Sequence, residues 1–594
     1  MQLLKAIKHQ LTGRRLLWNI FFYVGHLLIF IYGWWKQASD ARLAGLNTLK
    51  FSVWTSRGAG LCLGIDGLFI VLPVLRNIIR VLRPALTWLI PLDENLWMHR
   101  QFAYSILFFS ILHTTAHYVN MLNKETAWAI MYTQPGGFTG HVMLLLMLLI
   151  FTTAHRKIRE KCFEAFWYTH HLVILFLLCL YVHAVGCFVR GALPDTPVRC
   201  LGYYSWVWTI WGGIAYFFER IVREVRSRRS TRIISVLMHP SGTMELRFVK
   251  PSFKYKAGQW LFLSVPDVSG MQWHPFTISS APDDPYVSVH IRQVGDWTMA
   301  LGNRLGCTRS LAAELNSTAT GAYPSAAEEK ARLARLDSIS LSEDDGASMS
   351  GSGCGKSDDE YGKGEFYDVT TSALAAGGNL PRIKVDGPFG APAEDVFKAE
   401  VAVLVGAGIG VTPFASILKN VWYKQQQNRL GALRRVHFIW IARDTGSMGW
   451  FNALLRQLEE AQTDPSFLTL SLYLTQHLSP SAIANISIHS TSSSSSSKGS
   501  KGGDDDLDPV TRLSARTQYG RPDFAALFGA MRAGIEKGNW LPGRETRLRT
   551  TVGVFYCGPD PLARALKEHT ERASAAGSGC GEGGVKFTFV KEKF

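Results

Sequence analysis

Long apolar stretches dominate the first 229 residues, and shorter alternating segments follow them. A helix needs about 20 residues, most of them apolar, to cross about 30 Å of hydrocarbon. The pattern predicts six membrane-spanning helices, near residues 16–35, 60–80, 98–121, 137–154, 166–186 and 203–221. The first stretch is too long for a cleaved signal peptide and no small-residue cleavage site follows it, so we expect it to remain in the protein.

Beyond the apolar stretches the period of the pattern changes. Segments such as RIISVLMH, TMELRFVK and YVSVHIRQV alternate and predict antiparallel strands of a small β-barrel over residues 230–306. Strands alternate with helices over 376–594, which is typical of an α/β domain. Residues 307–375 and 486–508 are rich in Ser, Gly and acidic side chains and predict disordered insertions.

The basic residues define an orientation. The net charge of +16 would indicate nucleic-acid binding only if it covered one soluble face, but Lys and Arg instead flank the apolar stretches, and we therefore expect no nucleic-acid partner. Basic clusters fall in the four segments Lys5–Arg15, Arg76–Arg100, His155–Lys161 and Arg220–Arg232. All four lie on one side of a six-span arrangement, which predicts a multi-pass protein with both termini in the cytoplasm. On the other side, Cys187 and Cys200 form either a disulfide or two free thiols.

Histidines inside apolar spans are costly and call for a role. The third and fifth spans hold six of them: His99, His113, His117, His170, His171 and His183. His99 and His113 share a helix face about 21 Å apart along the axis. On the fifth span neither His170 nor His171 shares a face with His183, so a kink or a rotated group is required. Paired histidines at two depths can ligate two stacked haems, the alternative being polar contacts between helices, the role expected for unpaired His26.

Two motifs in the barrel region have side chains that suit a nucleotide. The candidate residues are His274, Pro275, Phe276, Thr277, Arg292, Gly295, Trp297 and Thr298. An arginine, a glycine and hydroxyl donors suit a pyrophosphate, and a Pro-Phe-Thr segment can hold a flat ring against backbone. The same segment could also be an ordinary turn.

The α/β region contains a glycine turn between a strand and a helix, VLVGAGIGVTPFASIL. Glycines allow the backbone to approach a phosphate, and a helix N-terminus supplies free N–H groups, although an ordinary strand-to-helix turn has the same pattern. Arginines at later strand ends are partners for a 2′-phosphate, which favours NADPH over NADH. The candidate residues are Gly406, Gly408, Gly410, Thr412, Pro413, Arg443, Arg521, Cys557, Gly558 and Pro559.

Six blocks in this order resemble the catalytic subunits of the NADPH oxidase family, within the ferric reductase superfamily. They are FWYTHHL (166–172), HPFTISSAP (274–282), HIRQVGDWT (290–298), DGPFGAP (386–392), GAGIGVTPFASIL (406–418) and YCGPDP (556–561). The resemblance implies a six-helix transmembrane bundle with two haems, then a ferredoxin-reductase-like β-barrel FAD domain and an α/β NADPH-binding domain.

The resemblance also implies roles for single residues. His99 and His170 would hold the inner haem and His113 and His183 the outer one. Arg57 and His117 match the family's oxygen site. Thr277 and its neighbours would contact FAD, Arg292 and Trp297 would contact its phosphates, and Phe594 would cover the flavin ring.

The implied activity is transfer of electrons from cytosolic NADPH through FAD and two b-type haems to O2, which yields superoxide on the far side of the membrane. Related proteins without calcium modules often require a small partner protein in the membrane and cytosolic activators including a Rac-type GTPase. The rival hypotheses are a ferric-chelate reductase with the same cofactors and, in a different class, a proton channel that uses the intramembrane histidines.

Overall fold

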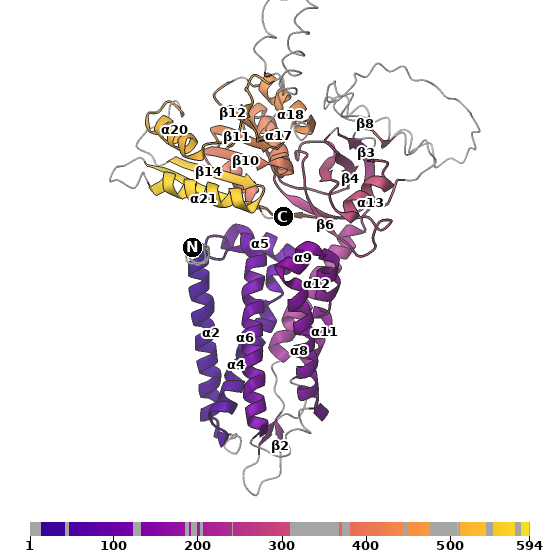
Figure 1. Cartoon of the computed structure of the whole chain (residues 1–594), viewed down its shortest axis with the longest axis vertical. Helices are drawn as coiled ribbons and strands as arrows, with labels where there is room; N and C mark the ends of the chain where they lie inside the picture. Colours follow the sequence, from indigo (N-terminus) through magenta and orange to yellow (C-terminus); the bar gives the residue numbers. More distant parts are fainter. Residues whose placement is uncertain are drawn as a thin grey trace, which may run out of the picture. The chain divides into compact units, whose positions relative to one another are not determined.

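The computed structural model divides the chain into two compact units, Met1–Arg223 and Glu224–Phe594 (Figure 1). The structure describes residues 13–41, 47–122, 132–183, 189–191, 199–201, 206–239, 241–308, 367–370, 380–443, 449–462, 464–475, 508, 511, 513–541, 550–575 and 584–592. Most of the two predicted insertions, together with Cys187 and Phe594, lies outside these residues.

The first unit is a helical bundle. Its helices are α2 (Gly13–Ser39), α4 (Phe51–Phe69), α5 (Arg76–Leu86), α6 (Asn95–Leu122), α8 (Pro135–Ala154), α9 (Arg156–Lys161), α10 (Phe163–His170), α11 (Val173–His183) and α12 (Trp206–Ser227). The basic helices α5 and α9 lie at one end of the bundle, and the short strand β2 (Arg199–Leu201) lies at the other (Figure 1).

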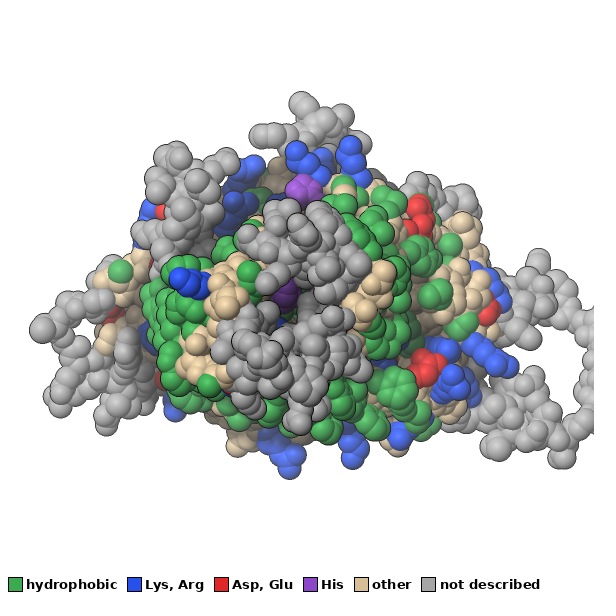
Figure 2. Space-filling view, turned by 90° about the horizontal axis from the view of Figure 1, so that it is seen from below, with side chains coloured by type: hydrophobic (Ala, Val, Ile, Leu, Met, Phe, Trp, Pro, Cys, Tyr) green, Lys and Arg blue, Asp and Glu red, His purple; other side chains and the backbone are tan. Residues whose placement is uncertain are grey.

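Within the residues that the structure describes, four segments are long and apolar enough to cross a membrane: Arg15–Ser39, Phe51–Val74, Pro135–Ala154 and Phe163–His183. Helices α6 and α12 have 28 and 22 residues, enough to span, but they carry more polar side chains. Six crossings therefore remain a prediction. Large apolar side chains are exposed along the bundle helices, as a lipid-facing surface requires (Figure 2).

The second predicted span, 60–80, was misplaced. Helix α4 begins at Phe51 and ends at Phe69, and Pro73 then lies in a short 3-10 turn, since proline removes a backbone donor. The basic segment that follows forms the separate helix α5. Of the two alternatives for the fifth span, a kink or a rotated group, the structure shows a break in the helix, because α10 ends at His170 and α11 begins at Val173.

Small residues let the bundle helices approach closely. A Cβ built on Gly58 of α4 would lie 2.7 Å from the Phe30 carbonyl oxygen of α2. A Cβ on Gly212 of α12 would lie 2.5 Å from the Leu68 carbonyl oxygen of α4. Close backbone approach through small residues is the usual way in which helices associate in lipid.

The second unit begins with the predicted β-barrel. One antiparallel sheet has the order β7-β4-β3-β8 and the other β6-β5-β9. Their strands are β3 (Arg232–Met238), β4 (Thr243–Val249), β5 (Trp260–Ser264), β6 (His274–Thr277), β7 (Val287–Arg292), β8 (Tyr367–Asp368) and β9 (Lys384–Phe389). Helix α13 (Asp296–Arg304) follows β7. The barrel was predicted to end at residue 306, but β8, in the predicted insertion, pairs with β3, and β9, in the region predicted as α/β, pairs with β5.

The α/β domain contains a parallel six-stranded sheet of order β13-β12-β11-β10-β14-β15. The strands are β10 (Val401–Ala407), β11 (Arg435–Ala442), β12 (Leu468–Leu474), β13 (Gln518–Tyr519), β14 (Thr550–Cys557) and β15 (Val585–Lys591). The helices are α17 (Thr412–Gln426), α18 (Gly449–Glu460), α20 (Phe524–Glu536) and α21 (Asp560–Ala575). Strand order reverses between β10 and β14, and ligands bind at such switch points.

Candidate functional site

Two pairs of histidine rings face each other across the bundle. The ring centres of His99 and His170 are 6.2 Å apart, and those of His113 and His183 are 6.4 Å apart. Two imidazoles that ligate one metal from opposite sides place their ring centres about 6 Å apart, because a metal–nitrogen bond is about 2 Å and the ring centre lies about 1 Å behind the nitrogen. Both pairs fit the axial ligation of haem iron.

Hydrogen bonds orient three of these rings. His99 Nδ1 lies 2.9 Å from the Ile70 carbonyl oxygen, and His113 Nδ1 lies 2.8 Å from the Ser56 carbonyl oxygen. A carbonyl only accepts, so Nδ1 donates and Nε2 is left as the metal-binding nitrogen. His183 Nδ1 contacts the Thr139 hydroxyl at 3.0 Å.

The choice between His170 and His171 is decided by their surroundings. His170 faces His99, whereas His171 is exposed and its Nδ1 contacts the Trp167 carbonyl oxygen at 2.7 Å. His170 lies on α10 and His183 on α11, so the two need not share one face of a continuous helix, which their spacing in the sequence did not allow.

Arg57 and His117 lie beside the second histidine pair. The rings of His113 and His117 are 4.5 Å apart, and the charge of Arg57 acts on both. The structure therefore brings together the two residues that the resemblance places at an oxygen site. Gly60 and Gly140 lie against His113 and His183, where a Cβ would come within 3.3 and 3.2 Å of the rings.

The predicted flavin segment is the edge strand β6 of its sheet. Among the described strands it pairs with β5 alone, and the next residue, Ile278, bridges to Val289 of β7, so no described strand pairs with the other edge of β6 itself. Pro275 and Arg292 are exposed and Phe276 is half-buried. This open edge fits an isoalloxazine ring, and exposed Arg292 fits a phosphate.

Two other predicted flavin residues have internal roles. The Trp297 side chain is buried and its ring stacks on His274 at 4.1 Å. Burial lowers the pKa of His274 to about 4, so this ring is neutral at pH 7. The Thr298 hydroxyl accepts from the Gly295 N–H at 3.0 Å, and thus it shapes the turn that starts α13.

The predicted dinucleotide turn lies at the switch point of the parallel sheet. Gly408 has φ of 57° and no atom within 4 Å of a built Cβ, so the turn is open on that side. A Cβ on Gly410 would lie 2.5 Å from the Cys557 carbonyl oxygen, which ties this turn to the Cys557-Gly558-Pro559 turn after β14. Thr412 and Pro413 open α17, whose N-terminus faces this region.

Arg443 and Arg521 are exposed where β11 and β13 end, on the carboxyl edge of the sheet. Burial raises the pKa of Cys557, so its thiol is not a ready nucleophile. Phe594 lies outside the described residues, but Glu592 accepts from the Ala393 N–H and its own N–H donates to the Tyr556 carbonyl at 2.8 Å.

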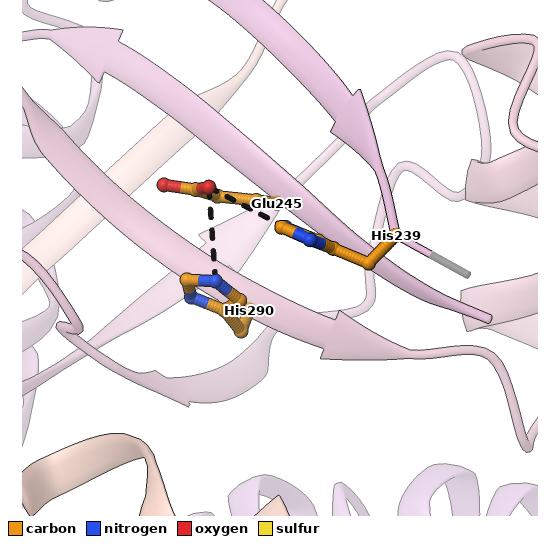
Figure 3. A group of neighbouring side chains, drawn as sticks. All are labelled: His239, Glu245 and His290. Atoms are coloured by element: carbon orange, nitrogen blue, oxygen red, sulfur yellow. Dashed lines mark ion pairs between the residues drawn. The ribbon is translucent and has the colours of Figure 1, made fainter. Parts of the chain in front are cut away.

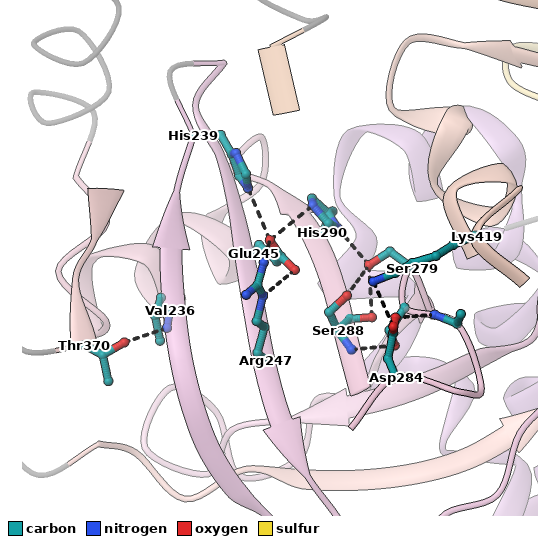
Figure 4. A network of polar contacts seen from close by, with 12 residues as sticks. Val236, His239, Glu245, Arg247, Ser279, Asp284, Ser288, His290, Thr370 and Lys419 are labelled. Atoms are coloured by element: carbon teal, nitrogen blue, oxygen red, sulfur yellow. Dashed lines mark hydrogen bonds and ion pairs between the residues drawn. The ribbon is translucent and has the colours of Figure 1, made fainter. Parts of the chain in front are cut away.

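Helix α17 joins the α/β domain to the barrel (Figure 4). Ser416 Oγ donates to the Ser280 carbonyl at 2.6 Å, and Lys419 Nζ lies 2.8 Å from Asp284 Oδ1. The Tyr423 hydroxyl donates to the same carboxylate at 3.1 Å. Burial and Asp284 raise the pKa of Tyr423 to about 12, which keeps this donor protonated. The helix that opens at the glycine turn therefore also holds the segment after the flavin motif.

A buried charged cluster lies inside the barrel (Figure 3). Glu245 Oε2 is 3.5 Å from His239 Nε2 and 3.7 Å from His290 Nε2. Arg247 donates to both carboxylate oxygens, at 2.8 and 3.1 Å, so its charge already neutralises Glu245 without a metal ion. His290 Nδ1 contacts Ser279 Oγ at 2.8 Å, which connects the cluster to the flavin motif (Figure 4).

Comparisons with known proteins agree with this geometry. Three family models match: "Ferric reductase like transmembrane component" over residues 59–181, "FAD-binding domain" over 228–393 and "Ferric reductase NAD binding domain" over 399–571. NADPH oxidase 1 of Mus musculus is 31% identical, covering 96% of this chain and 92% of that protein. The chain belongs to the NADPH oxidase family.

Distant members of the family match over similar lengths. A superoxide-generating NADPH oxidase heavy chain of Dictyostelium discoideum is 31% identical over 93% of this chain and 93% of that protein. NADPH oxidase 3 of Homo sapiens is 29% identical over 96% of each chain. The FAD-binding and NAD-binding domains of this NADPH oxidase are thus shown, and so is its membrane component.

Several buried charged groups of this NADPH oxidase were not among the predicted site residues. For Asp66 the sequence does carry a signal, because it is the one carboxylate in the apolar segment LCLGIDGLF. His26 makes the polar contact between helices that was expected of it, since it lies on α2 and its Nε2 is 2.9 Å from Asp66 Oδ1 on α4. Glu245 and Lys419 had no such signal, because their partners come from distant strands and helices.

Breaking the buried ion pair should destabilise the barrel of this NADPH oxidase. The side chains of Glu245 and Arg247 are 2% and 1% exposed. Glu245→Gln would leave the guanidinium buried without its counter-charge, which typically costs about 3–5 kcal/mol. Thermal release of FAD from the purified full chain measures this loss. Asp267→Asn, in the half-exposed pair with Arg304, is the control and should cost at most about 1 kcal/mol; equal effects would contradict the prediction.

The barrel of this NADPH oxidase should also lose stability in mild acid. Burial lowers the pKa of His290 to about 3, despite the opposing charge of Glu245. The unfolded chain binds this proton near pH 6.5, so stability falls as pH drops from about 6.5 towards 3. We expect a loss of about 2 kcal/mol between pH 7 and 5. The midpoint temperature of FAD release, measured across this pH range, gives the slope of stability against pH. His290→Gln should flatten this slope. Equal slopes in the parent and the variant would refute the assignment of the effect to His290.

Proposed function

We propose that this protein is a transmembrane NADPH oxidase that carries electrons from NADPH to O2 and releases superoxide. One observation carries the proposal: the bundle contains two histidine pairs, His99 with His170 and His113 with His183, whose ring centres are 6.2 and 6.4 Å apart. The same chain has FAD-binding and NAD-binding domains. The names of the relatives, NADPH oxidases and a superoxide-generating heavy chain, support the same activity.

The chain's own residues supply the binding sites. His99 with His170, and His113 with His183, would hold two b-type haems. The open edge of β6 and Arg292 would hold FAD, and the glycine turn with Arg443 and Arg521 would hold NADPH. When bound, these groups convert the two-electron donor into single electrons.

Other groups of the protein would orient the histidine rings, stabilise charge at the oxygen site and cover the flavin ring. The Ile70 and Ser56 carbonyls fix the Nδ1 protons of two histidines, so that Nε2 stays directed at the metal position. Arg57 and His117 would stabilise the negative charge that O2 gains on reduction, since both lie beside the outer pair. Phe594 would cover the flavin ring until nicotinamide displaces it.

We infer that both termini are cytoplasmic. The support is the gathering of α5 and α9, both basic, at one end of the bundle, together with the basic positions before α2. His99 begins α6 near that end, so its pair is the inner one. A small partner protein in the membrane and a Rac-type GTPase are proposed activators by family resemblance.

NADPH-driven superoxide formation in membranes, assayed with and without Fe(III), tests the function. Superoxide that requires NADPH and is accompanied by a b-type Soret band supports the oxidase. Iron reduction without superoxide would replace it with a ferric-chelate reductase. Proton current from a protein that lacks haem absorbance would replace it with a channel.

A further inference from the structure

A carboxylate is fully buried inside the helical bundle. Asp66, on α4, has 0% exposure, and its two oxygens are engaged by different helices. His26 Nε2 of α2 lies 2.9 Å from Oδ1, and the Ser105 hydroxyl of α6 donates to Oδ2 at 2.6 Å. A charge in a membrane span that has no role in substrate binding calls for another role.

The hydrogen bonds fix the number of protons in this cluster. His26 Nδ1 lies 2.7 Å from the Phe22 carbonyl oxygen, which only accepts, so Nδ1 carries a proton. Between His26 Nε2 and Asp66 Oδ1, one proton completes the contact, whichever atom holds it. The histidine and the carboxyl together are then neutral overall, and every polar atom in the contact is satisfied.

The position of the cluster links it to the histidine pairs. On α4, Asp66 lies between Ser56 and Ile70, whose carbonyls accept from His113 and His99. On α6, Ser105 lies between the same two histidines. The Asp66–Ser105 hydrogen bond therefore ties α4 to α6 between the two carbonyls that orient histidines of α6, those of Ser56 in α4 and of its C-cap residue Ile70.

We propose that Asp66 is a positioning residue that holds α4 in register with α6, so that His99 and His113 both keep their carbonyl partners and direct Nε2 at a haem. This inference rests on the proposed function. A slip of α4 along α6 would break both Nδ1 bonds at once, because the two acceptors belong to one helix. The role requires hydrogen bonding and shape, and it does not require a net charge.

Two substitutions of Asp66 distinguish its hydrogen bonding from its ability to carry a charge. Asp66→Asn keeps an acceptor for Ser105 and a partner for His26 but removes the ionisable group. Asp66→Leu removes both hydrogen bonds and strands two buried polar side chains. Ser105→Ala, which deletes only the α6 contact, is a milder variant if the leucine protein does not accumulate. Cys62→Ala, on the same helix and also buried, is the matched control.

Electron paramagnetic resonance of the two low-spin haems and their retention during dialysis are the readouts on the purified full chain. We expect Asp66→Leu and Ser105→Ala to alter both signals together and to lower haem affinity by about 10-fold, the loss typical when a ligand's orienting partner is disturbed. Asp66→Asn and Cys62→Ala should match the parent.

Parent-like signals from the folded leucine or alanine variant would overturn the proposal, as would a change at one haem only. A change in the asparagine variant equal to that in the leucine variant would assign the effect to charge and would equally overturn it. Absence of any haem band in the parent would instead refute the proposed function, so the two failures are distinguishable.

Discussion

Replacing His170 with leucine should abolish NADPH-driven superoxide formation, whereas replacing its neighbour His171 should not. His170 faces His99 at 6.2 Å, and His171 is exposed. Loss of an axial ligand should cost more than the roughly 10–100-fold lost when an outer partner of a ligand is removed. Superoxide assays and haem spectra on membranes, normalised to protein, measure the effect.

The two substitutions are a matched pair, because they remove the same side chain from consecutive positions. Haem spectra should retain one of two low-spin components in the His170 variant and both in the His171 variant. Equal loss in both proteins would mean that the kink at this point, and not the ligand, is what leucine disturbs. Full activity in the His170 variant would remove the inner pair from the proposal.

Gly410→Val should block the use of NADPH while leaving the flavin in place. A Cβ at this position would lie 2.5 Å from the Cys557 carbonyl oxygen, a backbone atom that cannot rotate away. The two turns at the switch point would be forced apart, and such overpacking typically costs about 1–3 kcal/mol, or roughly 10–100-fold in binding. Stopped-flow reduction of bound FAD by NADPH measures the loss.

Gly529→Ala is the control in the same domain, because nothing lies within 4 Å of a Cβ built there on α20. FAD content should equal that of the parent in both variants, since the barrel is untouched. A Gly410→Val protein that reduces FAD at the parental rate would show that the dinucleotide does not bind at this turn.

Periodicity predicted the architecture because it reports burial. The apolar side chains of RIISVLMH and YVSVHIRQV marked buried strands, and both are found in the barrel, where almost every residue of each strand is buried. The range predicted for the second span was wrong because the apolar run continues past Phe69, where α4 ends, into a segment that Pro73 prevents from remaining helical. Hydropathy measures the cost of transfer to lipid and does not register the loss of a backbone donor.

The candidate site could be predicted only where the chemistry is local. The glycine turn before α17 is contiguous in sequence, and the structure confirms that it lies between a strand and a helix, at the point where the strand order reverses. Helical spacing could not select between His170 and His171, and only the resemblance named His170, because the break between α10 and α11 depends on packing. The partnership of Asp66 with His26 and Ser105 joins three helices, and no spacing rule along one chain shows it.

The attachment of α17 to the barrel limits where this protein can change in length. Its contacting residues Ser416, Lys419, Asn420 and Tyr423 recur at the intervals of one helical face. One residue inserted between Pro413 and Ser416 would rotate that face by about 100° and carry the cation away from Asp284. We therefore expect insertions in natural relatives to avoid this helix and to collect in the connections between elements.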